Sequence, residues 1–173
     1  MFRLEYRNTV SKEKNDGIKF IIDFLNIAYF TKEDGKAKIE NVLLVEEALH
    51  THYPKATIVM IADASARHHV NKPAMFEAMT SSGKIITTPA KEQADYYILR
   101  YAEAGDKRFI ITNDQYNDHS ISDDIRSKII SFAIIDGEVI FNQKVDECIE
   151  YPELKVLPKR RALKNYKKNV KRL

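Results

Sequence analysis

The stretch from Ile18 to Tyr29, IKFIIDFLNIAY, constrains the fold of this chain more than any other. Its first residues form a short apolar run rich in β-branched side chains, which is typical of a strand buried on both faces of a parallel sheet. The run ends at a carboxylate, Asp23, and an amide, Asn26, follows three residues later. An acid at the carboxyl end of a central strand lies where open α/β sheets admit ligands. Because an unpaired buried charge is costly, Asp23 needs a partner, either a divalent cation or the N–H groups of a helix that it caps.

Strand-like and helix-like segments alternate along the rest of the chain. The predicted strands cover 56–62, 84–88, 108–112 and 128–135, and the predicted helices cover 39–53, 73–83 and 91–105, with a short or irregular piece at 121–126. Asp136-Gly137 then predicts a hairpin turn that leads to a last strand over 138–141. This order predicts an α/β fold with a central, mainly parallel sheet, right-handed crossovers and helices on both faces.

Acidic residues recur just past the predicted strands. Asp63 follows the strand over 56–62, Asp114 follows the strand over 108–112, and Asp118 comes four residues later. If these strands are parallel, their acids gather at one edge with Asp23, and Asp95 near the start of a helix lies at the same edge. Oxygen ligands without Cys or His favour a hard ion, Mg²⁺ or Mn²⁺. At each single position, a helix cap or a solvated acid remains the alternative.

A hard metal in a carboxylate pocket serves phosphate chemistry, because it activates water and stabilises charge on the phosphate. The chain has only 5 Gly and contains no Gly-rich phosphate loop, which argues against a nucleoside triphosphatase or a dinucleotide-binding protein. A phosphatase that uses Asp23 as the phosphate acceptor is one alternative, although no second acid stands two residues later. A binding module with a weakened site is another.

Aromatic and imidazole side chains near these acids have a structural interpretation. We expect Tyr96, Tyr97 and Tyr101 to pack in the core rather than to form a base-stacking platform. We expect His68 and His69, in a polar loop beside an arginine, to lie at the surface, with a phosphate-contacting loop as the alternative.

The net charge of +3 is unevenly distributed. The segment from Lys159 to Leu173 holds 8 of the 28 Lys and Arg residues and no acid, so the remaining 20 basic residues stand against 25 acidic ones. The tail also carries apolar residues at helical spacing. Such a tail could bind a nucleic-acid backbone, remain a solvated basic end, or act in targeting or at a membrane surface.

Three motifs together resemble a known family. IIDFLNIAY, AKEQADYYILRYAEAGDKRFIITNDQYND and RSKIISFAIIDGEVIF are similar to the NYN branch of the PIN-like nucleases, and most similar to the ribonuclease domain of the CCCH-zinc-finger (regnase-type) proteins. The resemblance covers roughly Ile18 to Asn142. It implies a PIN-like three-layer sandwich and a metal-dependent endoribonuclease that uses Mg²⁺ or Mn²⁺ to hydrolyse RNA, leaving a 5′-phosphate and a 3′-hydroxyl.

The resemblance also implies roles for single residues. Asp23 would be the central metal ligand, Asn26 would hold the pocket or contact the phosphate, Asp95 and Asp114 would be the second and third acids, and Asp118 would hold a water bound to the metal. These five residues are the catalytic candidates, and the four aspartates are the metal-ligand candidates. The substrate-binding candidates are Thr112, Asn113, Lys91, Arg67, Lys159, Arg160 and Arg161.

This chain departs from the family pattern at one acid. Ala94 stands where the family often has the first of two adjacent acids, so one carboxylate is missing, and Asp63 could compensate in part. The single Cys148 excludes a CCCH zinc finger within this sequence and an internal disulfide.

The sequence predicts an N-terminal arm over 1–17, the nuclease-like domain over 18–157 and the basic tail over 158–173. No apolar stretch approaches the ~18 residues of a membrane helix, and the N-terminus shows no signal-peptide apolar region. We therefore expect RNA as the partner, no membrane and a cytoplasmic location, while the tail leaves the nucleus or nucleolus open. A homodimer is also open.

Overall fold

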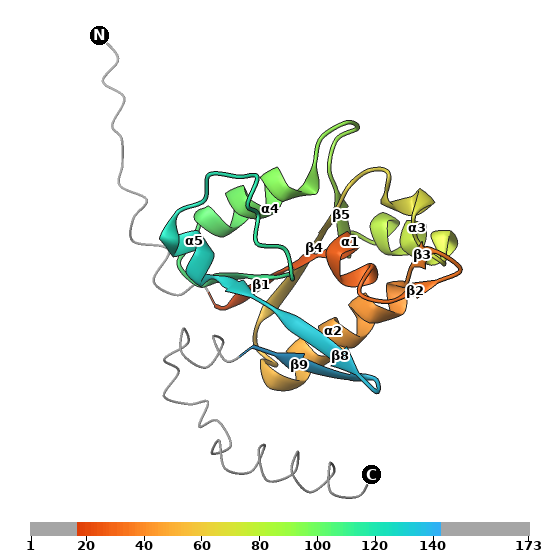
Figure 1. Cartoon of the computed structure of the whole chain (residues 1–173), viewed down its shortest axis with the longest axis horizontal. Helices are drawn as coiled ribbons and strands as arrows, with labels where there is room; N and C mark the ends of the chain where they lie inside the picture. Colours follow the sequence, from red (N-terminus) through yellow and green to blue (C-terminus); the bar gives the residue numbers. More distant parts are fainter. Residues whose placement is uncertain (1–16, 143–173) are drawn as a thin grey trace, which may run out of the picture. The chain divides into compact units, whose positions relative to one another are not determined.

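The computed structural model describes residues 17–142 (Figure 1). Residues 1–16 and 143–173 lie outside the described residues, and so do the basic tail and all of the predicted arm except Gly17. In the part that is described, no helix is long and apolar enough to cross a membrane.

A sheet of five parallel strands forms the centre of the fold, as the sequence predicted. The strands lie in the order β5-β4-β1-β6-β7, with β1 in the middle. They are β1 (Lys19–Asp23), β4 (Thr57–Ala62), β5 (Ile85–Thr87), β6 (Arg108–Ile111) and β7 (Ile129–Ile130). In the register, Ile21 of β1 stands beside Val59 of β4 and Ile110 of β6. The middle of β1 is completely buried, because the sheet is covered on both faces.

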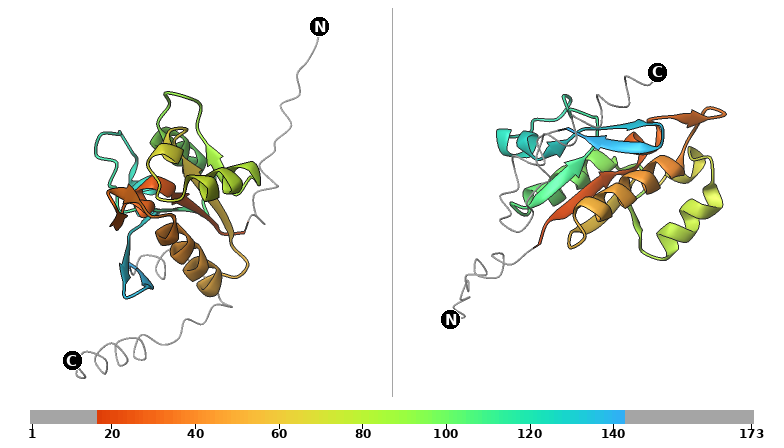
Figure 2. Two further views of the ribbon diagram at one scale, coloured as in Figure 1. Left: turned by 90° about the vertical axis from the view of Figure 1, so that its right-hand side faces the viewer. Right: turned by 90° about the horizontal axis from the view of Figure 1, so that it is seen from below.

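Helices cover both faces of this sheet and make it a three-layer structure. The elements are α1 (Phe24–Ala28), α2 (Ile39–His52), the 3₁₀ turn η2 (Ala66–His68), α3 (Pro73–Ser81), α4 (Ala94–Glu103) and α5 (Asp123–Ser127). Ile21 packs in a cluster with residues of α4 and α5, including Ile98 and Ile125. Phe20, on the opposite face of β1, contacts Tyr53 at the end of α2, with ring centroids 5.0 Å apart. The views in Figure 2 show α2 and α4 on opposite sides of the sheet.

Helix α4 buries a narrower stripe than the sequence predicted. Ile98, Leu99 and Ala102 are buried against the sheet, whereas Tyr96 is 56% exposed. The prediction that Tyr96 packs in the core is therefore wrong. Ile98 lies two positions after Tyr96, and at ~100° per residue this places the two side chains on opposite sides of the helix. Tyr97 and Tyr101 are partly buried and pack against the core cluster.

The strand predicted over 128–135 is in fact two strands. β7 joins the central sheet beside β6, and β8 (Phe132–Ile135) pairs antiparallel with β9 (Glu138–Phe141). The side chain of Asn113 binds the backbone of Phe132 on both sides, with its Nδ2 donating to the carbonyl and its Oδ1 accepting from the N–H, each at 3.0 Å. The backbone therefore leaves the central sheet after Ile130. The predicted turn between β8 and β9 is confirmed, with Asp136 and Gly137 at φ values of 51° and 78°.

A second small hairpin was not predicted. β2 (Lys32–Glu33) and β3 (Lys36–Ala37) pair antiparallel. Asp34 and Gly35 turn the chain between them with positive φ values, a conformation that Gly and Asp adopt most easily. This hairpin leads directly from α1 into α2.

Candidate active site

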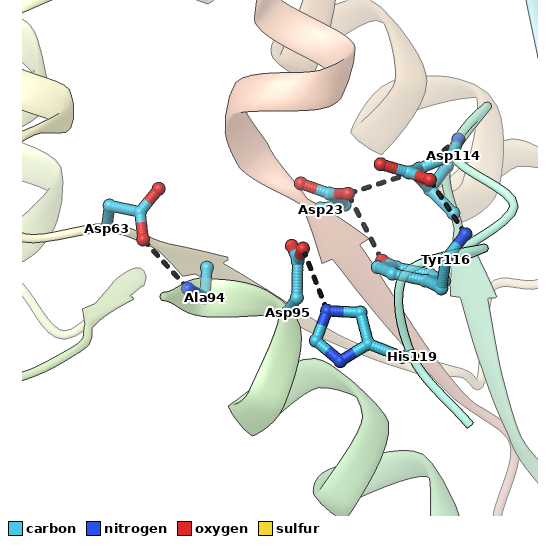
Figure 3. A network of polar contacts seen from close by, with 8 residues as sticks. Asp23, Asp63, Ala94, Asp95, Asp114, Tyr116 and His119 are labelled. Carbon is cyan, nitrogen blue, oxygen red and sulfur yellow. Dashed lines mark hydrogen bonds and ion pairs between the residues drawn. The ribbon is translucent and has the colours of Figure 1, made fainter. Parts of the chain in front are cut away.

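A pocket of about 470 Å³ opens at the carboxyl ends of β1, β4 and β6. Four of its lining side chains are carboxylates, and they come from four separate segments: Asp23, Asp63, Asp95 and Asp114. Figure 3 shows the carboxylates of Asp95 and Asp114 pointing toward that of Asp23. Three of the four predicted metal ligands thus share one pocket, as expected for acids that follow parallel strands.

Asp23 both caps a helix and lines the pocket. It ends β1 and is the N-cap of α1, where its Oδ1 accepts a hydrogen bond from the Asn26 N–H at 3.4 Å. The residue is only 6% exposed. Burial raises the pKa of Asp23 from 3.8 to about 6, and the charge of Asp95 adds to the rise although hydrogen bonds to Asp23 oppose it. Asp23 is therefore both a helix cap and a pocket residue, so the two interpretations of the sequence are compatible at this position.

Two buried hydroxyl groups orient the Asp23 carboxylate. Thr112 Oγ1 and the Tyr116 hydroxyl donate to its Oδ2, at 2.9 Å and 3.2 Å. Thr112 is completely buried, so its hydroxyl serves Asp23 and the N–H of Asp114 rather than the pocket surface. Burial and the charges of Asp23 and Asp95 raise the pKa of Tyr116, which keeps its hydroxyl protonated and able to donate.

The loop after β6 is fixed to α1 by an amide. The Oδ1 of Asn26 accepts from the backbone N–H of Asn113 at 2.8 Å. Asp114 follows, and its Oδ1 accepts from the N–H of Tyr116 at 2.7 Å, a local turn that Asp commonly makes. Tyr116 adopts a positive φ of 49° at this turn. Asn26 therefore helps to place Asp114 at the pocket.

Asp95 enters the pocket from the first turn of α4. Burial and then the charge of Asp114 raise its pKa, while His119, with Nε2 at 3.5 Å from Asp95 Oδ2, acts in the opposite direction. The raised pKa values of Asp23 and Asp95 have a common cause, because each carboxylate is partly or fully desolvated near another acid. The pocket thus concentrates negative charge.

Asp63 is a helix cap supplied from a distant segment. Its Oδ1 accepts from the N–H of Ala94 at 2.8 Å, whereas Gln93, which directly precedes α4, makes no side-chain cap hydrogen bond. The charge of Asp63 also contributes to the raised pKa of Asp95. Asp63 therefore caps the helix, and its charge is added to the pocket beside Ala94.

Three other predicted site residues that the structure describes do not line this pocket. Asp118 is exposed and is not among the residues that line it. Lys91 is exposed with a positive φ of 71°, and Arg67 in η2 forms an exposed ion pair with Glu77 at 3.5 Å. The candidates Lys159, Arg160 and Arg161 lie outside the described residues.

Two residues at the site were missed by the sequence reasoning, Tyr116 and His119. Both lie within five residues of Asp114, and their rings contact one another with centroids 6.1 Å apart. Their place in the loop that carries Asp114 was the available signal. What could not be read from the sequence was the direction of that loop, which a positive φ at Tyr116 sets.

The donor atoms of the pocket fit a hard divalent cation in kind. They are carboxylate oxygens. The charge of Asp95 raises the pKa of Asp23, and the charge of Asp114 raises that of Asp95, a repulsion that a cation would relieve. Between residues 17 and 142, however, no three Asp, Glu, His or Cys side chains are placed as a ready metal-ligand set. Asp114 Oδ1 accepts from the Tyr116 N–H and Asp95 Oδ2 faces His119, so binding one ion requires these two carboxylates to move closer to that of Asp23, toward which they already point.

The fold and a carboxylate pocket at the strand ends define a nuclease-like α/β domain of the NYN class. Residues 18–152 match the family described as the Zc3h12a-like ribonuclease NYN domain, and the chain belongs to this family. Among solved structures, the chain is similar to the nuclear proteinaceous RNase P 2 (PRORP2) from A. thaliana, with a TM-score of 0.59 and 19% identity. That match covers 75% of this chain and 30% of the PRORP2 chain, and it supports the fold alone. A comparison with curated proteins gave no match.

Proposed function

We propose that this chain is a metal-dependent endoribonuclease that hydrolyses the phosphodiester bonds of RNA. One observation carries the proposal: Asp23, Asp95 and Asp114, from three distant segments, line a single pocket at the ends of parallel strands. The raised pKa values of Asp23 and Asp95 support it, because a pocket that gathers acids, with no Lys or Arg among its described lining residues, is suited to an added cation. Family membership supports RNA as the substrate.

Mg²⁺ or Mn²⁺ held by Asp23, Asp95 and Asp114 would neutralise their repulsion, lower the pKa of a water and stabilise charge on the scissile phosphate. The remaining roles belong to the chain itself. Thr112 and Tyr116 fix the orientation of Asp23, and Asn26 fixes the loop that carries Asp114. This arrangement limits the side-chain movement needed to assemble the site.

The reaction adds water to phosphorus and breaks the bond from phosphorus to the 3′ oxygen. The products are a 5′-phosphate and a 3′-hydroxyl, and the 2′-hydroxyl takes no part. Asp118, exposed in the same loop as Asp114, stays the candidate for holding the attacking water. Basic residues of the tail, Lys159, Arg160 and Arg161, are candidates for contacts with the RNA backbone, and their removal should flatten the salt dependence of binding.

A second candidate function is RNA binding without cleavage. Ala94 in place of an acid favours it, and so does the present placement of the pocket carboxylates, which is not a ready ligand set within residues 17–142. The cytoplasmic location and the homodimer remain predictions.

The test is cleavage of an end-labelled single-stranded RNA in the presence of Mn²⁺ or Mg²⁺. We expect wild-type protein to cut, and Asp23→Asn and Asp114→Asn to fold but not to cut. Asp136→Asn is the matched control, since it makes the same chemical change at an exposed turn residue whose positive φ Asn tolerates. Binding without cutting by the wild-type protein would favour the binding module, and cutting by Asp23→Asn at the wild-type rate would exclude the proposed site.

A further inference from the structure

The pocket has an aromatic side as well as an acidic one. Tyr29 and Phe30 line the same pocket as Asp23, Asp95 and Asp114. Phe30 is 37% exposed, which is high for a phenylalanine in a folded domain. Its ring also contacts Phe132, with centroids 5.3 Å apart, so the ring is supported from the protein side and open on the other.

The backbone at the end of α1 fixes both rings at the pocket. The N–H of Tyr29 donates to Leu25 at 2.9 Å, and the N–H of Phe30 donates to Ile27 at 3.0 Å. Residues three apart share a helix face, so Tyr29 lies on the same side of α1 as Asn26, which lines the pocket too. The aromatic residues therefore have a fixed place relative to the acids.

A cation stands next to this aromatic surface. The ammonium group of Lys32, in β2, lies 5.5 Å from the centre of the Tyr29 ring. The ring of Tyr29 also contacts that of His69, with centroids 6.4 Å apart. An open aromatic ring, a neighbouring ammonium and an acidic pocket match the three parts of a nucleotide chain: the base, the adjacent phosphate and the phosphate to be cut.

We propose that Tyr29 and Phe30 form a base-binding wall that stacks an unpaired nucleobase next to the scissile phosphate, with Lys32 contacting a neighbouring phosphate. The proposal rests on the proposed nuclease function and deepens it. Phe30 supplies the stacking surface, and Tyr29 completes the wall and holds Lys32 in place. Because a base must leave a duplex to reach an aromatic face, the wall selects single-stranded RNA and tolerates different bases.

The chain offers a matched control in Tyr96. It is the other strongly exposed aromatic residue between residues 17 and 142, and Arg100 lies over its ring at 5.8 Å. It is adjacent to Asp95 in sequence but does not line the pocket. A variant of Tyr96 therefore tests whether any exposed aromatic ring contributes to base binding, or only the rings at the pocket.

The experiment compares two fluorescent ligands by anisotropy in EDTA, where no cutting occurs. One is a short single-stranded RNA, and the other is an abasic ribose-phosphate chain of the same length and charge. We expect the wild-type protein to bind the abasic chain about tenfold more weakly. Phe30→Leu, which keeps an apolar contact with Phe132, should lose this preference, while Phe30→Tyr and Tyr96→Ala should keep it. Both ligands are measured on the same metal-free protein, so the ratio of their two affinities does not depend on the absence of metal.

Equal binding of the two ligands by wild-type protein would contradict the base-binding wall. A second contradicting result would be that Tyr96→Ala loses the preference for RNA over the abasic chain while Phe30→Leu keeps it. If Phe30→Leu does not fold, photo-crosslinking of wild-type protein to RNA that contains 4-thiouridine gives the answer. A crosslink at Tyr29 or Phe30 supports the wall, and crosslinks only elsewhere contradict it. Cleavage with Mn²⁺, measured on the same preparation, separates the two proposals: cutting without base preference removes the wall alone, and base preference without cutting removes the nuclease alone.

Discussion

Two groups of acidic side chains in this domain face opposite electrostatic conditions. Around Asn71, Glu40 forms an ion pair with Lys72 and accepts a hydrogen bond from the Asn71 amide at 2.9 Å. Burial alone would raise the pKa of Glu40, but the contacts with Lys72 and Asn71 lower it to about 2. In the pocket, burial raises the pKa of Asp23 to about 6 and also raises that of Asp95.

The difference lies in what neutralises the charge. Glu40 has a lysine from its own chain as partner, so its ionised form is stable in the folded protein. No Lys or Arg is among the described residues that line the pocket, where Asp23 and Asp95 are held near each other and near Asp114. The first group needs nothing from outside and links α2 to the segment before α3. The second is set up for a cation that none of residues 17–142 supplies as a lining Lys or Arg.

The largest expected difference between the two groups is in catalysis. Asp95→Asn should lower the rate of RNA cleavage at least about 100-fold, since it removes one of three expected ligands of an ion worth several kcal/mol to the transition state. Glu40→Gln should leave the rate within about twofold. Single-turnover cleavage of a labelled RNA measures both. A comparable loss in the two variants would mean that the two acidic groups do not differ in function.

Metal addition should stabilise the protein through the pocket alone. At a Mn²⁺ concentration about 100 times the dissociation constant, the free energy of unfolding should rise by about 2.7 kcal/mol at pH 7.5. The rise should persist in Glu40→Gln and disappear in Asp23→Asn. Urea unfolding with Mn²⁺ and with EDTA gives the values. Equal stabilisation of all three proteins would place the ion outside the pocket.

Without metal, pH should act on the two groups with opposite sign. The carboxyl of Asp23 binds its proton more tightly in the folded state, with a pKa of about 6, than in the unfolded state, with a pKa of 3.8. The folded state therefore holds more protons between these values, and this residue removes roughly 2–3 kcal/mol of stability as the pH rises from 4 to 7. Glu40, with its pKa lowered from 4.5 to about 2, contributes stability above pH 4.5 that is lost toward pH 2.

Urea unfolding in EDTA across this pH range tests the Asp23 effect. The stability of the wild-type protein relative to Asp23→Asn should fall as the pH rises from 4 to 7, so the variant gains its advantage at neutral pH. A difference between the two proteins that does not change with pH would show that Asp23 titrates normally.

The smallest expected effect is the change in stability when the ion pair of Glu40 with Lys72 is removed. The Glu40 side chain is about one-third exposed, so solvent weakens its pair with Lys72. Glu40→Gln keeps an acceptor for the Asn71 amide and should lower the free energy of unfolding at pH 7 by about 1 kcal/mol or less. Urea unfolding at low and high salt measures it, and a loss above 3 kcal/mol would mean that this pair is far more important to the fold than its exposure indicates.

Much of the fold and part of the site could be predicted, because both depend on short-range patterns. Buried strands such as β1 are continuous apolar runs, and acids that follow parallel strands must meet at one edge, which placed Asp23 and Asp114 together. Asp95 was predicted from its place near the start of a helix. These predictions needed no knowledge of side-chain partners.

The rest depends on contacts between distant segments. Asp63 caps α4 across 31 positions of sequence, and Asn113 ends the sheet at Phe132 by binding its backbone. Tyr116 adopts a positive φ and donates to Asp23 across 93 positions of sequence. Tyr96 was wrongly predicted to be buried, because apolar character was taken as burial without regard to helix direction. None of these contacts leaves a local pattern in the sequence.

The most direct test of the account is a crystal of the full chain soaked in Mn²⁺, with the ion located by its anomalous scattering. The account predicts one strong peak between Asp23, Asp95 and Asp114, with carboxylate oxygens of all three at about 2.0–2.3 Å, a range typical of a small divalent ion. A peak that contacts none of these residues, or a pocket that stays empty at saturating Mn²⁺, would contradict it.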